Sequence, residues 1–129
     1  MLEEFLKYIK DNSLVSEEDR VLLAVSGGID SMVMADLFFK AGMKTGIIHC
    51  NFCLRGKESD KDEELVRNLA EENNVPFFSK RFGTKAYSKK KGISLQMAAR
   101  DLRYAWFEET REKNGYNSVA VAHNLNDNI

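Results

Sequence analysis

The chain has 129 residues, of which 43% are hydrophobic, and its 19 basic and 20 acidic residues leave a net charge of −1. This length predicts one domain with a substantial apolar core, and the near-zero net charge gives no global signature of a nucleic-acid-binding protein. Because no apolar run approaches the ~20 residues of a membrane span and no signal segment opens the chain, we expect a cytoplasmic protein without membrane contact.

Helical and extended apolar patterns alternate along the chain. We expect, in chain order, a helix over 2–10, a strand over 21–25, a helix over 32–39 that stops at Gly42, a strand over 45–49, a polar loop over 51–59, a helix over 60–73, a strand over 77–82, a long helix capped by Ser94, and a strand over 118–122. The two later helices each have an apolar face, formed by Leu65, Leu69 and Ala70 in one and by Leu95, Ala98, Ala99, Leu102 and Trp106 in the other.

Alternation of strands and helices predicts the α/β class, with a doubly wound parallel sheet whose crossovers are right-handed. Ligands of such sheets bind outside the carboxyl ends of the strands. The loops that matter are therefore 26–31, 49–56, 82–94 and 123–128, and most of the unusual polar residues fall within them.

The most informative segment joins the apolar run 21–25 to Ser26-Gly27-Gly28-Ile29-Asp30-Ser31. Glycines let the backbone approach a ligand closely, and the amino end of the following helix favours an anion, so we expect a phosphate site. The spacing fits neither the Walker loop nor the dinucleotide fingerprint. The alternative is a plain Gly-Gly turn in which a serine or the aspartate only caps the helix.

Two other features are weaker. Cys50 and Cys53 form a lone C-x-x-C without a second ligand pair, which favours accidental spacing over a redox or zinc site. Seven acidic residues lie within 58–72, and a stretch without acids follows at Lys80, Arg81, Lys85, Lys89, Lys90 and Lys91. That stretch is either a patch that meets phosphates or a solvated lysine-rich loop.

The Ser-Gly-Gly-x-Asp-Ser loop resembles the pyrophosphate loop of the ATP-pyrophosphatase (PP-loop) superfamily, whose Rossmann-like domains split ATP between the α and β phosphates. The resemblance implies that Ser26, Gly27, Gly28, Ile29 and Ser31 form the pyrophosphate cradle. It also implies that Asp30 takes part in catalysis, as an Mg²⁺ ligand or polar organiser.

Three further motifs resemble the lysidine-synthetase family of that superfamily. They read His49-Cys50-Asn51-Phe52-Cys53-Leu54-Arg55-Gly56, Ala98-Ala99-Arg100-Asp101-Leu102-Arg103-Tyr104 and Ala122-His123-Asn124-Leu125-Asn126-Asp127. Where the family has His, Gly, His and Asp, this chain has Phe52, Cys53, Asn124 and Asn126. The resemblance implies nucleotide contacts from His49 and Arg55, and catalytic roles for Arg100, Arg103, His123 and Asp127. Alternatively, the histidines are structural, and the arginines form surface ion pairs with Asp101 or Glu108.

The resemblance also implies a reaction. ATP and Mg²⁺ would adenylylate the wobble cytidine of isoleucine tRNA, and free lysine would then displace AMP to give lysidine. Residues 1–129 would form the N-terminal ATP-pyrophosphatase domain of a longer ligase whose C-terminal regions grip tRNA; a homodimer is left open. Two alternatives are a tRNA thiolase of the same superfamily, which could use Cys50 and Cys53, and a non-catalytic adenine-nucleotide-binding module.

Overall fold

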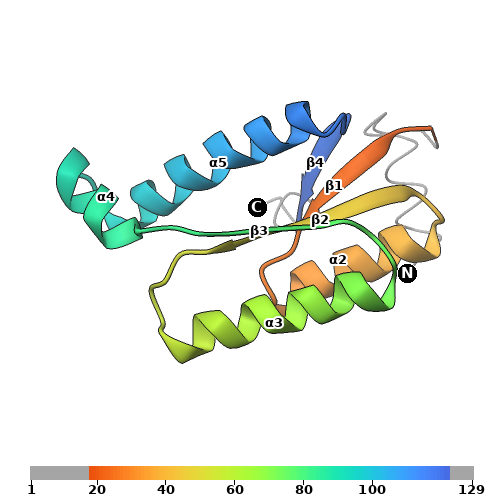
Figure 1. Ribbon diagram of the computed structural model, residues 1–129, viewed down its shortest axis with the longest axis horizontal. Helices are drawn as coiled ribbons and strands as arrows, with labels where there is room; N and C mark the ends of the chain where they lie inside the picture. Colours follow the sequence, from red (N-terminus) through yellow and green to blue (C-terminus); the bar gives the residue numbers. More distant parts are fainter. Residues whose placement is uncertain (1–17, 123–129) are drawn as a thin grey trace.

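The computed structural model describes residues 18–122, so the helix expected over 2–10 and the predicted site residues His123 and Asp127 lie outside the described part. The elements are β1 (Arg20–Ala24), α2 (Ile29–Lys40), β2 (Lys44–Asn51), α3 (Lys57–Glu72), β3 (Phe77–Arg81), α4 (Thr84–Lys91), α5 (Leu95–Lys113) and β4 (Ser118–Val121). The strands form one parallel sheet in the order β3-β2-β1-β4, which confirms the predicted fold class (Figure 1).

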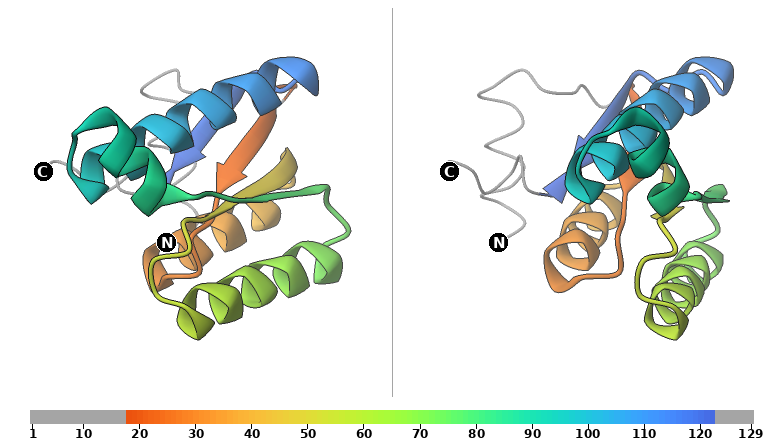
Figure 2. Two further views of the ribbon diagram at one scale, coloured as in Figure 1. Left: turned by 60° about the vertical axis from the view of Figure 1, so that its left-hand side comes forward. Right: turned by 90° about the vertical axis from the view of Figure 1, so that its left-hand side faces the viewer.

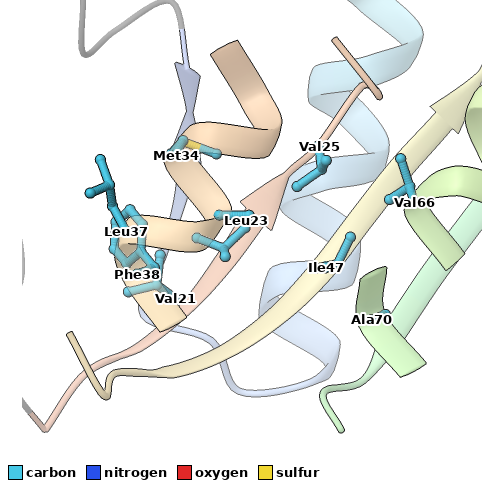
Figure 3. Packing of buried hydrophobic residues seen from close by; sticks show 10 residues of the cluster. Val21, Leu23, Val25, Met34, Leu37, Phe38, Ile47, Val66 and Ala70 are labelled. Atoms are coloured by element: carbon cyan, nitrogen blue, oxygen red, sulfur yellow. The ribbon is translucent and has the colours of Figure 1, made fainter. Parts of the chain in front are cut away.

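Helices cover both faces of the sheet: α2 and α3 lie on one face, and α4 and α5 lie toward the other (Figure 2). In β1, Val21 and Leu23 pack toward α2 and α3 (Figure 3). Leu22 and Ala24 instead join the cluster around Phe107 of α5. The central strand is thus covered on both sides, which explains its unbroken apolar run. Each of its fully buried leucines contributes about 2 kcal/mol of burial free energy.

The apolar faces predicted for α3 and α5 were partly wrong. In α3 the buried side chains are Glu63, Val66 and Ala70, whereas Leu65 is 44% exposed. The buried face was misplaced because it contains a charged residue, Glu63, and a search for apolar residues at helical spacing passes over a charged one. Leu95, the first residue of α5, is 42% exposed because α5 begins beside α4, ahead of the sheet (Figure 1).

The segment 82–94 was expected to be a loop, but it contains the two-turn helix α4. Gly92, at φ 67°, ends α4 in the left-handed conformation that glycine favours. Ser94 then caps α5 as predicted, since its hydroxyl accepts a hydrogen bond from the Met97 amide. Among the helices of residues 18–122, none is long and apolar enough to cross a membrane.

Candidate functional site

A cavity of about 480 Å³ opens at the carboxyl ends of β1, β2 and β4, where the topology predicts a ligand. Its polar side is the loop after β1, represented by Ser26, Gly28, Asp30 and Ser31. The rest of the wall, as far as residues 18–122 form it, is mostly apolar and contains one cationic side chain. Its residues are Ala24, Val25, Ile48, Cys50, Phe52, Arg103, Phe107, Val121 and Ala122. A volume with a polar phosphate-sized end and an apolar remainder suits a nucleotide.

The loop is held in shape by its two serines. The Ser31 hydroxyl accepts a hydrogen bond from the Ser26 amide at 3.1 Å and donates one to the Gly28 carbonyl at 3.0 Å. The Ser26 hydroxyl in turn accepts a bond from the Gly28 amide at 3.3 Å. Gly27 takes φ 99°, a conformation that a non-glycine residue rarely adopts. The buried Ser31 therefore fixes the shape of the cradle through its hydrogen bonds to the loop backbone.

Among residues 18–122 no side chain caps the amino end of α2, where Gly28 is the capping residue. Neither a serine nor Asp30 therefore caps this helix in the described part of the chain. The first amides of a helix have no partner within it, and together with the helix dipole they attract an anion. The uncapped amino end beside the cavity is what a phosphate cradle requires.

Replacing Gly28 with valine is expected to weaken ATP binding at least ~10-fold while the domain stays folded. Gly28 has φ −76°, and among the described residues a Cβ built there would meet only the Ser26 hydroxyl, at 3.5 Å. The branched side chain would therefore fit the fold but occupy the place of the phosphate. Calorimetric titration with ATP gives the affinity; an unchanged affinity in a folded variant would contradict the cradle. Gly27 is unsuitable for this test because its Cβ would press on Asp62 at 3.1 Å.

Asp30 lies in the first turn of α2, is exposed and lines the cavity. Within residues 18–122 no three His, Cys, Asp or Glu side chains gather as a ready metal cage. Proteins commonly hold Mg²⁺ through one or two carboxylates and the phosphates of a substrate, and a single aspartate beside a phosphate cradle fits that pattern. Asp30 is thus the described residue that could hold the ion.

His49 and Arg55 take different places from the predicted nucleotide contacts. His49 is only 3% exposed and does not line the cavity; its Nδ1 donates to the Val25 carbonyl at 2.8 Å, which ties the end of β1 to β2. Its Nε2 is buried without a partner among residues 18–122. Arg55 is exposed and pairs with Asp62, which lies against Gly27. Arg55 is thus connected to the loop only indirectly, through its ion pair with Asp62.

The two arginines of α5 separate in space. Arg103 lines the cavity, and its Nε is buried without a hydrogen-bond partner among the described residues. Arg100 is exposed and does not line the cavity, although both guanidinium groups lie over the Tyr104 ring, at 5.5 Å for Arg100 and 5.0 Å for Arg103. The alternative ion pairs of these arginines with Asp101 or Glu108 are not formed, and Glu108 pairs instead with Arg111.

A buried polar network between β2, α3 and β3 was missed by the sequence analysis. Glu63 accepts hydrogen bonds from Asn51 at 2.9 Å and Ser79 at 3.0 Å, and it pairs with Arg67 and Arg81. Burial alone would raise the pKa of Glu63, but the hydrogen bonds from Asn51 and Ser79, with the charges of Arg81 and His49, hold that pKa below its usual value. The sequence did contain a signal: Glu63 lies three and seven residues before Val66 and Ala70, so helical spacing places this charged residue on their apolar face.

Replacing Glu63 with glutamine is expected to lower the free energy of unfolding by about 2 kcal/mol at pH 7, because charged hydrogen bonds at a buried site are lost. A carboxyl whose pKa is lowered by folding stabilises the fold above its unfolded pKa, here near 4.5, and that contribution is lost as the pH falls through the folded pKa. Denaturant unfolding from pH 7 to pH 3 should therefore show a shallower acid dependence in the variant. The neighbouring exposed Glu64→Gln is the matched control; an equal effect there would contradict the role of the network.

The two cysteines are free thiols with different surroundings. Burial raises the pKa of Cys50 to about 12, even though Arg103 lies near enough to lower it, so this cavity-lining thiol stays protonated at neutral pH. Cys53 is exposed, and its φ of 57° lies in the left-handed region. The family that this motif resembles has glycine at the same position. A protonated thiol is a poor nucleophile and a poor metal ligand, which weakens the thiolase alternative.

Comparisons with known proteins bear on the family and on the fold. The family model described as the PP-loop domain matches residues 1–129. Among solved structures, an NH3-dependent NAD synthetase from Campylobacter jejuni is similar in fold, with a TM-score of 0.70 over 92% of this chain and 53% of that chain, at 21% sequence identity.

Curated relatives that are named tRNA(Ile)-lysidine synthase match nearly the whole chain. The protein from Parabacteroides distasonis is 43% identical over 100% of this chain, and those from Clostridium acetobutylicum and Petrotoga mobilis are 40% and 39% identical over 98% and 97% of it. The chain spans 30%, 28% and 41% of the length of these three relatives, respectively.

Proposed function

This chain belongs to the PP-loop domain family, and on that premise we propose that it is the ATP-binding part of a ligase that attaches lysine to the wobble cytidine of isoleucine tRNA. The relatives named tRNA(Ile)-lysidine synthase, at about 40% identity over the chain, support this substrate pair. The observation that carries the chemistry is that one cavity joins the uncapped amino end of α2, Asp30 and Arg103. ATP and tRNA meet in the cytoplasm, which is the proposed location.

The reaction has two displacements. The carbon-2 oxygen of the cytidine attacks the α-phosphorus of ATP, and the bond to pyrophosphate breaks. The amine of lysine then attacks carbon 2, loses a proton, and AMP leaves with the oxygen. Lysine, Mg²⁺ and a homodimer belong to this proposal, as do the catalytic roles of His123 and Asp127.

The cavity offers a physical reason for each part of the first displacement. The amides at the start of α2 would hold the departing pyrophosphate, where negative charge develops. Mg²⁺ held by Asp30 would neutralise part of the phosphate charge when bound. Arg103 would supply a fixed positive charge at the apolar wall, where the low dielectric strengthens its attraction to the negative charge of the phosphates. Phe52 and Phe107 would exclude water from the activated base.

The test is mass spectrometry of the nucleosides of isoleucine tRNA after incubation with the full-length protein, ATP and lysine. Lysidine should form only when all three are present, with AMP and pyrophosphate released in equal amounts. A tRNA with uridine at the wobble position is the matched control and should stay unmodified. A thiolated nucleoside would favour the thiolase, and ATP binding without release of pyrophosphate would favour a binding module.

A further inference from the structure

A group of exposed basic residues lies on and beside α4, which we call the α4 basic surface; its members are Lys85, Lys89, Lys90, Lys91 and Arg100. None of them forms an ion pair with an acid among residues 18–122, whereas Lys40, Lys61, Arg67 and Arg111 elsewhere each pair with a neighbouring acid. Residues 80–100 contain seven basic residues and no acidic one, and among the described residues only Arg81 of the seven pairs with acids, Asp60 and Glu63. The five charges of the α4 basic surface therefore have no ion-pair partner in the described part of the chain.

Helix stability does not explain this charge. The helix dipole favours lysines in the last turn of a helix, and this explains in part why α4 ends with Lys89, Lys90 and Lys91. Lys85, however, lies in the first turn of α4, where the dipole disfavours a cation and where α4 has no acidic residue. With α4 largely exposed and lysine-rich, folding alone gives little reason for such a sequence.

The surface is connected to the cavity. The first residue of α4, Thr84, is fully buried, and its hydroxyl donates to the carbonyl of Phe52 at 2.8 Å, while Phe52 itself lines the cavity. On α5, Arg100 and Arg103 share the Tyr104 ring, which is 40% exposed. Thr84 thus ties α4 to the cavity wall through Phe52, and the Tyr104 ring joins Arg100 to Arg103 in that wall.

We propose that the α4 basic surface binds the phosphate backbone of the RNA whose base enters the cavity. The inference rests on the proposed function and adds to it where the RNA docks. Unpaired lysines recognise phosphates electrostatically. Aromatic rings lie beside them, the exposed Tyr104 and the half-buried Tyr87 under Lys91, and such rings are platforms on which unpaired bases stack. Contacts to the backbone on α4 would set the register in which one base reaches the cavity.

The experiment compares two neutralised triple variants of the full-length protein. One carries Lys85→Gln, Lys89→Gln and Lys90→Gln on α4. The matched control carries Lys40→Gln, Lys44→Gln and Lys113→Gln, whose residues lie near the amino ends of the strands, the edge of the sheet away from the cavity. Glutamine keeps helix propensity close to that of lysine, so both variants should fold. The readouts are the Kd for isoleucine tRNA at several salt concentrations, the Kd for ATP, and the kcat and KM of lysidine formation.

The α4 variant should bind tRNA at least ~10-fold more weakly than the wild type at 0.1 M salt, and its slope of log K against log salt should be smaller by about 2. Its KM for tRNA should rise, while its ATP affinity stays the same. An α4 variant with wild-type tRNA affinity and slope, or a control variant that loses as much, would overturn the inference while leaving lysidine formation intact. Absence of lysidine formation by the wild type would instead contradict the proposed function.

Discussion

Replacing Arg103 with alanine is expected to lower the kcat of lysidine formation by the full-length protein ~100-fold or more, which is the usual loss when one preorganised electrostatic group is removed. Arg103 lines the cavity, makes no ion pair among the described residues and leaves its Nε unpartnered, so its removal breaks no ion pair there and costs the fold little beyond its contact with the Tyr104 ring. The melting temperature should therefore stay close to that of the wild type. Single-turnover assays give the rate, and thermal unfolding gives the stability.

Arg100→Ala should behave differently, because Arg100 lies outside the cavity on the α4 basic surface. We expect a higher KM for tRNA and little change in kcat. Lys113→Ala, at the far end of α5, is the control for loss of a positive charge from the same helix and should change neither constant. A fall in unfolding free energy of several kcal/mol in Arg103→Ala would identify Arg103 as a structural partner. Normal stability with normal turnover would contradict its role and direct attention to Arg55.

The separation of the two arginines shows what helical periodicity can and cannot predict. Residues three apart lie about 60° apart around a helix, so a common side for Arg100 and Arg103 was a sound expectation, and both do share the Tyr104 ring. They also lie ~4.5 Å apart along the axis. Which of them reaches the cavity depends on where α5 crosses the sheet, and that is a tertiary fact absent from local sequence.

Strand alternation explains the place of His49 in the same way. Successive side chains of a strand point to opposite faces of the sheet. Ile48 and Cys50 of β2 line the cavity, so His49 between them faces the side of α2 and α3 and bonds to the Val25 carbonyl. The sequence analysis ended this strand at His49, whereas β2 continues to Asn51, and the register that turns His49 away from the cavity could be known only from the pairing of β1 with β2.

The sheet itself was predictable, because a strand covered on both faces has to be apolar throughout and β1 has that pattern. The short helix α4 was not, because its sequence consists largely of lysine and small residues without an apolar period. Its position depends on Thr84, whose hydroxyl bonds to a loop 32 residues away in the chain. Hydrophobic patterning detects cores, and α4 contributes almost nothing to one.

Replacing Asp30 with asparagine is expected to keep ATP affinity within a few-fold of the wild type while slowing adenylylation of the cytidine ~100-fold or more. Asp30 lies at the rim of the cradle, and a carboxylate that holds Mg²⁺ stabilises charge chiefly as the bond between the α and β phosphates breaks. Asparagine has nearly the same shape, so the cavity is preserved. Loss of a carboxylate from the first turn of α2 should cost only about 0.5 kcal/mol of stability.

The measurements for Asp30 are calorimetric titration with ATP and Mg²⁺, and single-turnover formation of the adenylylated tRNA by the full-length protein. Asp36→Asn is the matched control, because Asp36 lies on the same helix, is exposed and pairs only with Lys40 among the described residues. It should leave affinity and rate unchanged. Removal of a group lowers the rate without lowering the affinity only when that group acts more strongly in the transition state than in the ground state. If Asp30→Asn lost ATP affinity and rate by the same factor, Asp30 would therefore contribute to ground-state binding of ATP or to the stability of the amino end of α2.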